Sequence, residues 1–408
     1  MEQQRGKVRA EVKLPLILIH TPFGLDFFDR VAKMPGAKAW ATINAYMLPI
    51  ITVFAVVLIA SSLAVLFAEA GAREGVRAAG PQANLLIPGL NPYLPIGYGL
   101  AALFVTIVIH EAGHGIIARI YNVRVDSTGL VLFLGIPIGA FVNIERDELG
   151  KIQLKQKSAI LAAGPLNNMI LAGASLLALY LIISTLTPLP PDPNAPQFGV
   201  FVLSVNGGSL AESIGLEQGS TIQTVAGEQV RALEDLGRLL RANLGQTINI
   251  TWVTESNQTI TKAVTLPAAV EPGKGILGIG VTAVTPDSSM VLDRYKTAFG
   301  TNPLALLLPP TMQQGAVPYS DLMQDRYESS LGPSWSIIAN MLFWMWFINF
   351  NVGIFNALPI GPLDGGQLYS SIIEKKIRSA KLARNAATLL TTITIAIVAM
   401  SIMLPYVL

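Results

Sequence analysis

The sequence of 408 residues contains no cysteine and only three histidines, His20, His110 and His114. Without cysteine the chain can form no disulfide, bind no iron–sulfur cluster and use no thiolate as a nucleophile or metal ligand. Charged residues are scarce, at 13% against about 25% in an ordinary soluble protein, whereas hydrophobic residues make up 51%. The net charge is +2 and no long basic stripe is present, so we expect a membrane protein and no nucleic-acid partner.

Five segments have the length and composition of membrane-spanning helices, which need about 20 mostly apolar residues. Four of them contain no Asp, Glu, Lys or Arg: residues 46–68, 158–186, 334–358 and 385–408. The fifth, residues 96–121, is apolar except near its C-terminal end, where it carries His110, Glu111, His114 and Arg119. Ionisable side chains are costly inside a bilayer and persist mostly where they have partners or a task, so this end is the first place to search for chemistry.

Lysine and arginine gather in the segments on one side of these spans. Residues 1–45 hold seven, residues 119–157 six and residues 359–384 five, whereas residues 70–95 hold two. Because cytoplasmic segments carry the excess of positive charge, we expect a cytoplasmic N-terminus and an extracytoplasmic segment 187–333. The sequence therefore predicts an integral, multi-pass protein of a prokaryotic cell membrane, with the lipid bilayer as a partner.

Residues 129–142 form another apolar stretch, which is too short to cross a bilayer and is broken by Gly135, Pro137 and Gly139. Extended backbone persists in hydrocarbon only where protein or water satisfies its amides, so the stretch is predicted to be a re-entrant β-hairpin inside the helix bundle. A pair of strands at the membrane interface fits the same sequence. In the hairpin, these three residues are candidates for binding an unwound substrate segment as an added strand.

The segment 187–333 begins with a linker, residues 187–197, that contains five prolines. Residues 198–285 then show four strand-like runs and one segment with helical apolar spacing. Their order is similar to a circularly permuted PDZ domain of membrane proteases, except that Ser220 stands where such domains usually carry Asp. The resemblance implies that this domain binds a peptide end or excludes bulky ectodomains. The role of residues 286–333 is not readable from the sequence.

His110 and His114 belong to an HEAGH sequence, which is an HExxH motif on a predicted helix. Residues four apart share one helical face, so both imidazoles can bind one metal ion, and Glu111 can approach the water beside it. A hydrolytic zinc site uses three protein ligands and leaves one position for water, so a third ligand must come from elsewhere. The ligand types leave zinc or another divalent ion open. The alternative is a polar cluster that holds helices together.

Asp364 is the candidate for the third ligand, because it follows 35 residues without a charged side chain. Pro359 and Pro362 end the preceding helix, and Gly365 and Gly366 let the backbone bend so that the carboxylate turns back into the bundle. Asp364 and the two histidines all lie toward the cytoplasmic ends of their helices. An aspartate that only ends a helix in a turn is the alternative.

HEAGH in one membrane helix, NALPIGPLDGG at a later one and AGPLNN in the helix between them resemble the site-2 protease family of intramembrane metalloproteases. The resemblance spans most of residues 96–385. It implies a zinc ion held by His110, His114 and Asp364, with Glu111 as the general base.

The same resemblance implies that Asn356 positions the scissile carbonyl or stabilises its oxyanion, for which an amide donor is suited. The alternative is that Asn356 only satisfies carbonyls of the broken helix. Asn168, in AGPLNN, is predicted to pack helices rather than to catalyse, and His20 to be an ordinary surface or packing residue.

The expected fold is an α-helical polytopic membrane protein of five to six transmembrane helices, with a re-entrant β-hairpin and an inserted α+β PDZ-like domain. The expected parts are an N-terminal segment (1–45), a first membrane part (46–186), the linker (187–197), the PDZ-like domain (198–285), a connecting segment (286–333) and a second membrane part (334–408).

The expected function is zinc-dependent hydrolysis of peptide bonds in transmembrane protein substrates. The alternative is a non-catalytic membrane scaffold or chaperone with a structural metal and a partner-binding module. A transporter is less well supported, because only one cluster of intramembrane charge is visible.

Overall fold

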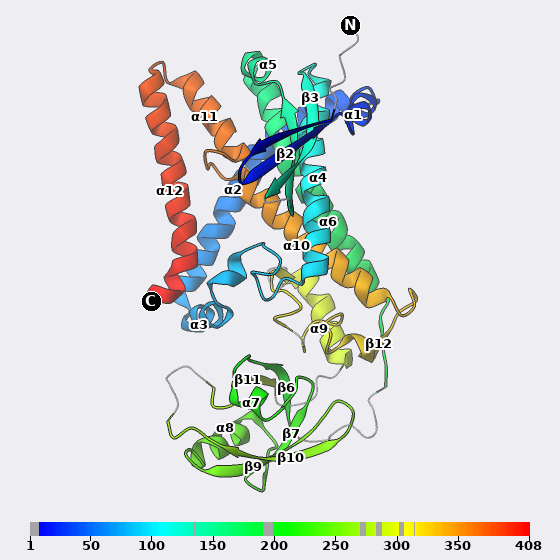
Figure 1. Ribbon diagram of the computed structural model, residues 1–408, viewed down its shortest axis with the longest axis vertical. Coiled ribbons are helices and arrows are strands. Elements are labelled where there is room, and N and C mark those ends of the chain that lie inside the picture. The colour runs from blue at the N-terminus through cyan, green and yellow to red at the C-terminus, as the bar shows by residue number, and fades with distance from the viewer. Residues whose placement is uncertain are drawn as a thin grey trace. The chain divides into compact units, whose positions relative to one another are not determined.

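The computed structural model describes residues 8–133, 136–190, 199–269, 275–282, 288–301, 306–313 and 315–408. The chain forms two compact units, which Figure 1 draws with the elements labelled. The membrane unit comprises Met1–Leu177 and Met341–Leu408, and the inserted unit comprises Ala178–Asn340.

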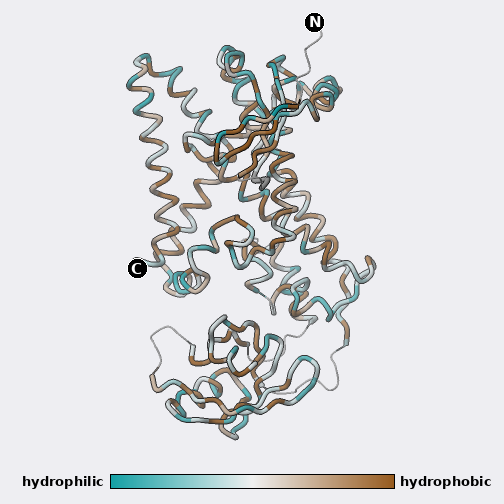
Figure 2. The backbone as a smooth tube through the Cα atoms, in the orientation of Figure 1, coloured by the Kyte–Doolittle hydropathy of each residue, from teal (hydrophilic) through white to brown (hydrophobic). Residues whose placement is uncertain are grey.

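Five helices of the described chain are long and apolar enough to cross a membrane, which confirms the predicted fold class. They are α2 (Ala37–Ala68), α4 (Ile96–Ile120), α6 (Leu154–Ser184), α10 (Trp335–Ala357) and α12 (Ala380–Val407). Figure 2 shows hydrophobic residues along most of their length. Large apolar side chains such as Leu100, Leu177 and Leu389 are more than half exposed, which suits a surface that contacts lipid rather than water. The helix α2 begins at Ala37, earlier than the charge-free run, because Lys38 in its first turn does not interrupt a helix that extends beyond the hydrocarbon.

A four-stranded antiparallel sheet lies in the membrane unit, in the order β1-β2-β3-β4. Its strands are β1 (Arg9–Lys13), β2 (Leu16–Thr21), β3 (Val125–Phe133) and β4 (Ile136–Ile144). The hairpin expected over residues 129–142 is β3–β4, and it is longer than expected. The first two strands come from the N-terminal segment, and β2 pairs with β3 from Leu16↔Phe133 to Thr21↔Thr128. The strand β4 is therefore the edge of this sheet on the side away from the N-terminal segment.

Shorter helices complete the membrane unit. They are α1 (Leu25–Ala32), α3 (Ala70–Ala79), η1 (Pro81–Asn84), α5 (Arg146–Lys151) and α11 (Asp364–Lys376). One buried apolar cluster joins α1, α2, α4 and α6. Another joins α2, α6, α10 and α11. The helix α6 takes part in both clusters, so it packs between the helix that carries HEAGH and the helices that flank Asp364.

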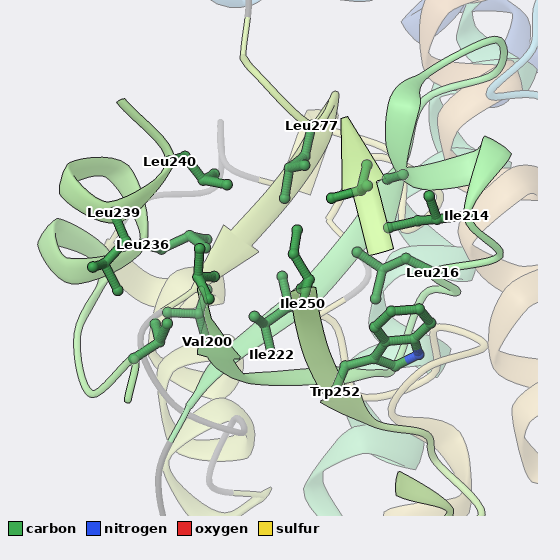
Figure 3. Close-up of a cluster of buried hydrophobic side chains, with 14 of the residues drawn as sticks. Val200, Ile214, Leu216, Ile222, Leu236, Leu239, Leu240, Ile250, Trp252 and Leu277 are labelled. Carbon is green, nitrogen blue, oxygen red and sulfur yellow. The ribbon is translucent and has the colours of Figure 1, made fainter. Parts of the chain in front are cut away.

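The inserted unit contains an antiparallel sheet in the order β10-β9-β7-β6-β11, with β8 paired to β7. Its described elements are β5 (Thr187–Pro188), β6 (Val200–Val205), α7 (Leu210–Ser213), β7 (Thr221–Val225), β8 (Glu228–Gln229), α8 (Leu233–Ala242), β9 (Thr247–Val253), β10 (Thr259–Thr265), β11 (Ile279–Thr282), α9 (Ser288–Thr301), η3 (Gln324–Arg326) and β12 (Tyr327–Glu328). In Figure 3, Leu236 and Leu240 of α8 lie over Val200, Ile222 and Ile250 of the sheet. The four expected strands and the expected helix are all present, and they enclose one apolar core.

The connecting segment also has regular structure in this unit. Its helix α9 carries Tyr295, whose hydroxyl lies 2.6 Å from that of Tyr319, and both side chains are buried. The short strand β12 pairs with β5, which directly follows α6 along the chain. These contacts tie the segment that leads into α10 to the segment that leaves α6. Residues 191–197, most of the predicted proline-rich linker, lie outside the described residues.

Candidate active site

The helix α4 carries His110 and His114 one turn apart, with ring centroids 4.8 Å from each other. Both side chains are buried, each 8% exposed. Two glycines of the same helix allow neighbours to come close. A Cβ at Gly113 would lie 2.7 Å from the Ala163 carbonyl oxygen, and one at Gly115 would lie 2.5 Å from the Phe28 ring. Each glycine lowers helix stability by about 1 kcal/mol relative to alanine. In return, the absence of a Cβ lets α6 and α1 pack closely on α4.

Asp364 is the first residue of α11 and lies just after the end of α10. Glycines follow it because the backbone folds back on the end of α10: a Cβ at Gly365 would collide with the Ala357 and Leu358 carbonyls. The turn brings Oδ2 of Asp364 to 3.2 Å from Nε2 of His110 and to 3.4 Å from Nε2 of His114. The side chains of the two distant motifs, separated by 250 positions from residue 114 to residue 364, therefore converge.

The three residues fit a metal ion. One ligand atom from each of His110, His114 and Asp364 lies within 4.8 Å of the others, and all three residues are buried. Oδ2 of Asp364 accepts no hydrogen bond of normal geometry from the described residues, which leaves it available to a cation. Nδ1 of His114 lies 2.7 Å from the Ile160 carbonyl oxygen. A carbonyl can only accept, so this Nδ1 carries the proton, and the neutral ring then presents the Nε2 lone pair to the cluster.

Gly164 of α6 lies against the two candidate histidine ligands, a contact that the sequence analysis did not identify. A Cβ built on it would lie 2.5 Å from Nε2 of both His110 and His114. Any larger residue would therefore occupy the space beside the two ligand atoms. The AGPLNN motif was the available signal, but its glycine could be assigned to this contact only once the register of α6 against α4 was known.

Asn168 touches the cluster rather than only packing helices. Its amide Nδ2 lies 2.9 Å from Nδ1 of His110, and its side chain is fully buried. The prediction that Asn168 serves helix packing is thus incomplete, because its amide contacts a candidate metal ligand.

Glu111 lies beside the two histidines on α4 and contacts the sheet. Its Oε2 accepts a hydrogen bond of 2.9 Å from the backbone N–H of Val142 in β4. Because this N–H points toward α4, it does not pair with β3, and the backbone groups of Ala140, two residues away, point to the same side. The candidate base is therefore positioned at the open edge of β4.

Asn356 and His20 form their hydrogen bonds with residues other than the three candidate ligands. Asn356 is in the last turn of α10, where its Nδ2 donates to the Val352 carbonyl of the same helix at 3.0 Å. Pro137 and Gly139 lie in β4, and Gly135 is outside the described residues. His20 is buried in β2, with Nδ1 3.0 Å from Oγ of Ser127, and it is not part of the metal-ligand group. Its packing role agrees with these contacts.

Known proteins give an independent comparison. The profile described as peptidase family M50 matches residues 98–401. An uncharacterized protein of Methanocaldococcus jannaschii is 23% identical over 360 residues, which cover 88% of this chain and 77% of that protein. A protein of Clostridium acetobutylicum whose name includes zinc metalloprotease is 25% identical over 324 residues, 71% of this chain and 91% of its own. The regulator of sigma-W protease RasP of Bacillus subtilis is 29% identical over 240 residues, 56% of this chain and 52% of its own. The matched region contains the HEAGH motif, Asp364 and the helix between them. The chain therefore belongs to peptidase family M50, the site-2 protease family, and is an integral membrane zinc metalloendopeptidase.

Proposed function

We propose that this protein hydrolyses peptide bonds within transmembrane segments of membrane-bound substrates, with His110, His114 and Asp364 as the zinc ligands and Glu111 as the general base. One observation carries the proposal: three buried ligand atoms from α4 and α11 lie within 4.8 Å of one another, beside a carboxylate. Three protein ligands leave a coordination position for water, as hydrolytic zinc sites require. A structural zinc site is usually closed by four protein ligands, and the group found among the described residues has three.

The chemistry follows from the positions of these residues. A bound zinc ion supplies Lewis-acid polarisation of the scissile carbonyl and lowers the pKa of the attacking water. Glu111 takes a proton from that water as the water oxygen bonds to the carbonyl carbon. When the carbon–nitrogen bond breaks, Glu111 returns the proton to the leaving amine. The hydrogen bond from Val142 limits the orientations of the Glu111 carboxylate during both transfers.

A substrate helix must unwind before it reacts, because its carbonyls are engaged in hydrogen bonds within the helix. No described strand pairs with the outer edge of β4 at Ala140, next to the Val142 amide that contacts Glu111. An unwound segment added to this edge would lie against the base, and Gly135, Pro137 and Gly139 are the predicted substrate-binding residues of the same hairpin. Alanine or leucine at the helix-breaking positions of the substrate should slow cleavage, whereas an unchanged rate would remove this step.

Asn356 is proposed to donate its amide to the developing oxyanion. In the absence of substrate, the amide donates to the Val352 carbonyl of its own helix, so a substrate oxygen would have to replace that acceptor. Asn356→Asp removes the donor at nearly constant volume. We expect a lower kcat than wild type with unchanged zinc content. A kcat equal to that of wild type would mean that Asn356 only satisfies helix carbonyls.

The inserted unit is proposed to govern access to this site. The order of its strands and helix supports a PDZ-like domain over residues 198–285, which would capture a peptide end or exclude large ectodomains. The excess of lysine and arginine in residues 1–45, 119–157 and 359–384 supports a cytoplasmic N-terminus and an extracytoplasmic inserted unit. The name of RasP concerns regulation of sigma-W. A membrane-held regulator is the corresponding substrate class for this chain.

The test is cleavage of a single-span membrane protein, whose span contains helix-breaking residues, by the full chain in detergent. Wild type should cleave within the span, and Glu111→Gln, Asp364→Ala and a chelated sample should not. Zinc content should fall to near zero in His110→Gln but stay at the wild-type level in His20→Gln, which changes the buried histidine outside the cluster. Equal cleavage by wild type, Glu111→Gln and the chelated sample would favour the scaffold or chaperone alternative.

A further inference from the structure

One face of α6 lies against both candidate histidine ligands. Ile160, Gly164 and Asn168 are spaced four residues apart and so share this face. Ile160 meets Nδ1 of His114, Asn168 meets Nδ1 of His110, and Gly164 leaves room beside the two Nε2 atoms. Each imidazole therefore directs Nε2 toward Asp364 and Nδ1 toward α6.

The partners of the two Nδ1 atoms differ in whether they determine which ring nitrogen carries the proton. The Ile160 carbonyl can only accept, so it fixes the proton of His114 on Nδ1. The Asn168 amide can present either its oxygen or its nitrogen, because the two ends have nearly the same shape and their assignment depends on the surrounding hydrogen bonds. As drawn, Nδ2 faces His110 and the buried Oδ1 has no hydrogen-bond partner among the described residues.

The two orientations of Asn168 have opposite consequences for His110. If Nδ2 donates, Nδ1 of His110 must accept, and the proton of the neutral ring then lies on Nε2, where it blocks metal binding. If Oδ1 accepts, the proton lies on Nδ1 and the Nε2 lone pair faces the cluster. Only the second orientation agrees with Nε2 of His110 as a ligand, and it makes both histidines equivalent.

We propose that Asn168 is a positioning residue whose amide oxygen accepts the Nδ1 proton of His110 and so holds that ring in the tautomer and orientation that bind zinc. This inference rests on the proposed role of His110 as a ligand. Full burial of Asn168 supports it, because an amide in an apolar helix interface costs more than an apolar side chain of the same size unless it forms a needed hydrogen bond. Partners of this kind typically change metal affinity by about 10- to 100-fold when they are removed.

The test measures zinc affinity of the full chain in detergent, by competition with a chromogenic chelator. Asn168→Leu removes the acceptor at similar volume and should weaken zinc binding by about 10- to 100-fold. Asn168→Asp keeps an acceptor and should bind zinc within about threefold of wild type, because carboxylates commonly serve as this partner. Asn349→Leu is the matched control: Asn349 is also fully buried in a membrane helix, but its amide donates to Met345 of the same helix. It should keep wild-type affinity.

Two results would overturn the inference. Wild-type affinity in Asn168→Leu would show that the acceptor is not needed, and equal loss in Asn168→Asp and Asn168→Leu would show that the amide acts as a donor. The absorption spectrum of the Co²⁺-loaded chain gives a second readout, which should change in Asn168→Leu and stay constant in Asn349→Leu. Elution as a single species and unchanged helical circular dichroism identify variants that are folded.

A further variant separates this inference from the function on which it rests. His110→Gln should lose zinc entirely. If His110→Gln keeps zinc, the proposed ligand set is wrong. If His110→Gln loses zinc while Asn168→Leu binds it as tightly as wild type, the ligand set holds and only the role of Asn168 is wrong.

Discussion

The carboxylate of Glu111 in α4 accepts a hydrogen bond of 2.9 Å from the backbone N–H of Val142 in β4. This bond connects the candidate base with the edge strand of the sheet. A substrate strand added to that edge would place its backbone next to the carboxylate that is proposed to activate water. If this edge binds the substrate and Glu111 is the base, the hydrogen bond holds the two at one separation, which favours proton transfer.

Glu111→Gln tests the base. Glutamine keeps the size of the side chain but cannot take a proton, so the cleavage rate should fall at least about 100-fold, the lower range for general acid–base catalysis. Zinc content should stay at the wild-type level, because Glu111 is not among the three clustered ligand residues. Rates come from cleavage of the single-span substrate, and zinc from elemental analysis of the same sample. Glu74→Gln, at an exposed position of α3, is the control and should leave both unchanged. Undiminished cleavage by Glu111→Gln would assign the proton transfers to another group.

Gly164→Ala tests the space beside the histidines. The added Cβ would lie 2.5 Å from Nε2 of His110 and of His114, closer than any real Cβ contact, so one ring or the helix must move. We expect zinc affinity to fall by at least about tenfold, as when a ligand loses its support. Gly173→Ala in the same helix adds the same methyl group where no atom lies within 4 Å, and it should bind zinc as wild type does. If the two variants bind zinc equally, the close approach of α6 has no functional role.

The candidate metal-ligating residues could be predicted from the sequence, because the patterns that identify them lie within short segments. HEAGH places two imidazoles on one helical face by spacing alone, and Asp364 is conspicuous after a long uncharged stretch. Five apolar runs likewise predict five spans, since each run meets the length requirement by itself.

The contacts that α6 makes with the two histidines could not be predicted, because they depend on how helices distant in sequence are aligned against each other. Gly164 and Asn168 were visible in a motif, but only the packing of α6 on α4 shows which histidine each one meets. The strands β1 and β2 were missed for a similar reason. Arg9–Lys13 carries three charged side chains and is exposed at every position, and β2 becomes part of the sheet through pairing with residues more than 100 positions away.

The buried tyrosine pair predicts an effect of alkaline pH on the inserted unit. Burial raises the pKa of the Tyr295 phenol above its usual value of about 10, and burial together with the adjacent Tyr295 raises the pKa of Tyr319 well above that usual value. The folded state then retains protons that the unfolded state releases. The stability from this pair is complete below pH about 10 and is lost as pH rises toward the folded-state values.

Thermal unfolding of the full chain, measured from neutral to strongly alkaline pH, checks this prediction. The wild-type transition of the inserted unit should move to lower temperature above pH about 10. The double variant Tyr295→Phe, Tyr319→Phe should lose less of its stability over the same range, because it lacks the two buried phenols of this pair. Tyr46→Phe removes an exposed tyrosine of the membrane unit and should retain the wild-type dependence. Identical curves for the double variant and wild type would contradict the assignment.

Thr391 of α12 holds the turn that leads to Asp364. Its Oγ1 accepts a hydrogen bond from the Gly361 N–H at 3.1 Å and lies 3.4 Å from the Pro359 carbonyl oxygen, to which it donates. The hydroxyl thus joins two points of the turn between α10 and α11. Thr391→Val keeps the shape and removes both bonds, which are worth about 1 kcal/mol net at a partly exposed site.

We expect this loss to appear in metal binding, because Asp364 follows the turn by three residues and its carboxylate must meet two rings on α4. If the full loss of about 1 kcal/mol of hydrogen-bond energy appears in the free energy of zinc binding, zinc affinity falls about fivefold. Thr394→Val is the matched control on α12 and should bind zinc as wild type does. Among the described residues, the Thr394 hydroxyl bonds only to the Leu390 carbonyl of its own helix. Thr391→Ser restores the hydroxyl and should restore affinity. Equal affinity in Thr391→Val and Thr394→Val would mean that the two prolines and the two glycines around Asp364 hold the turn without help from α12.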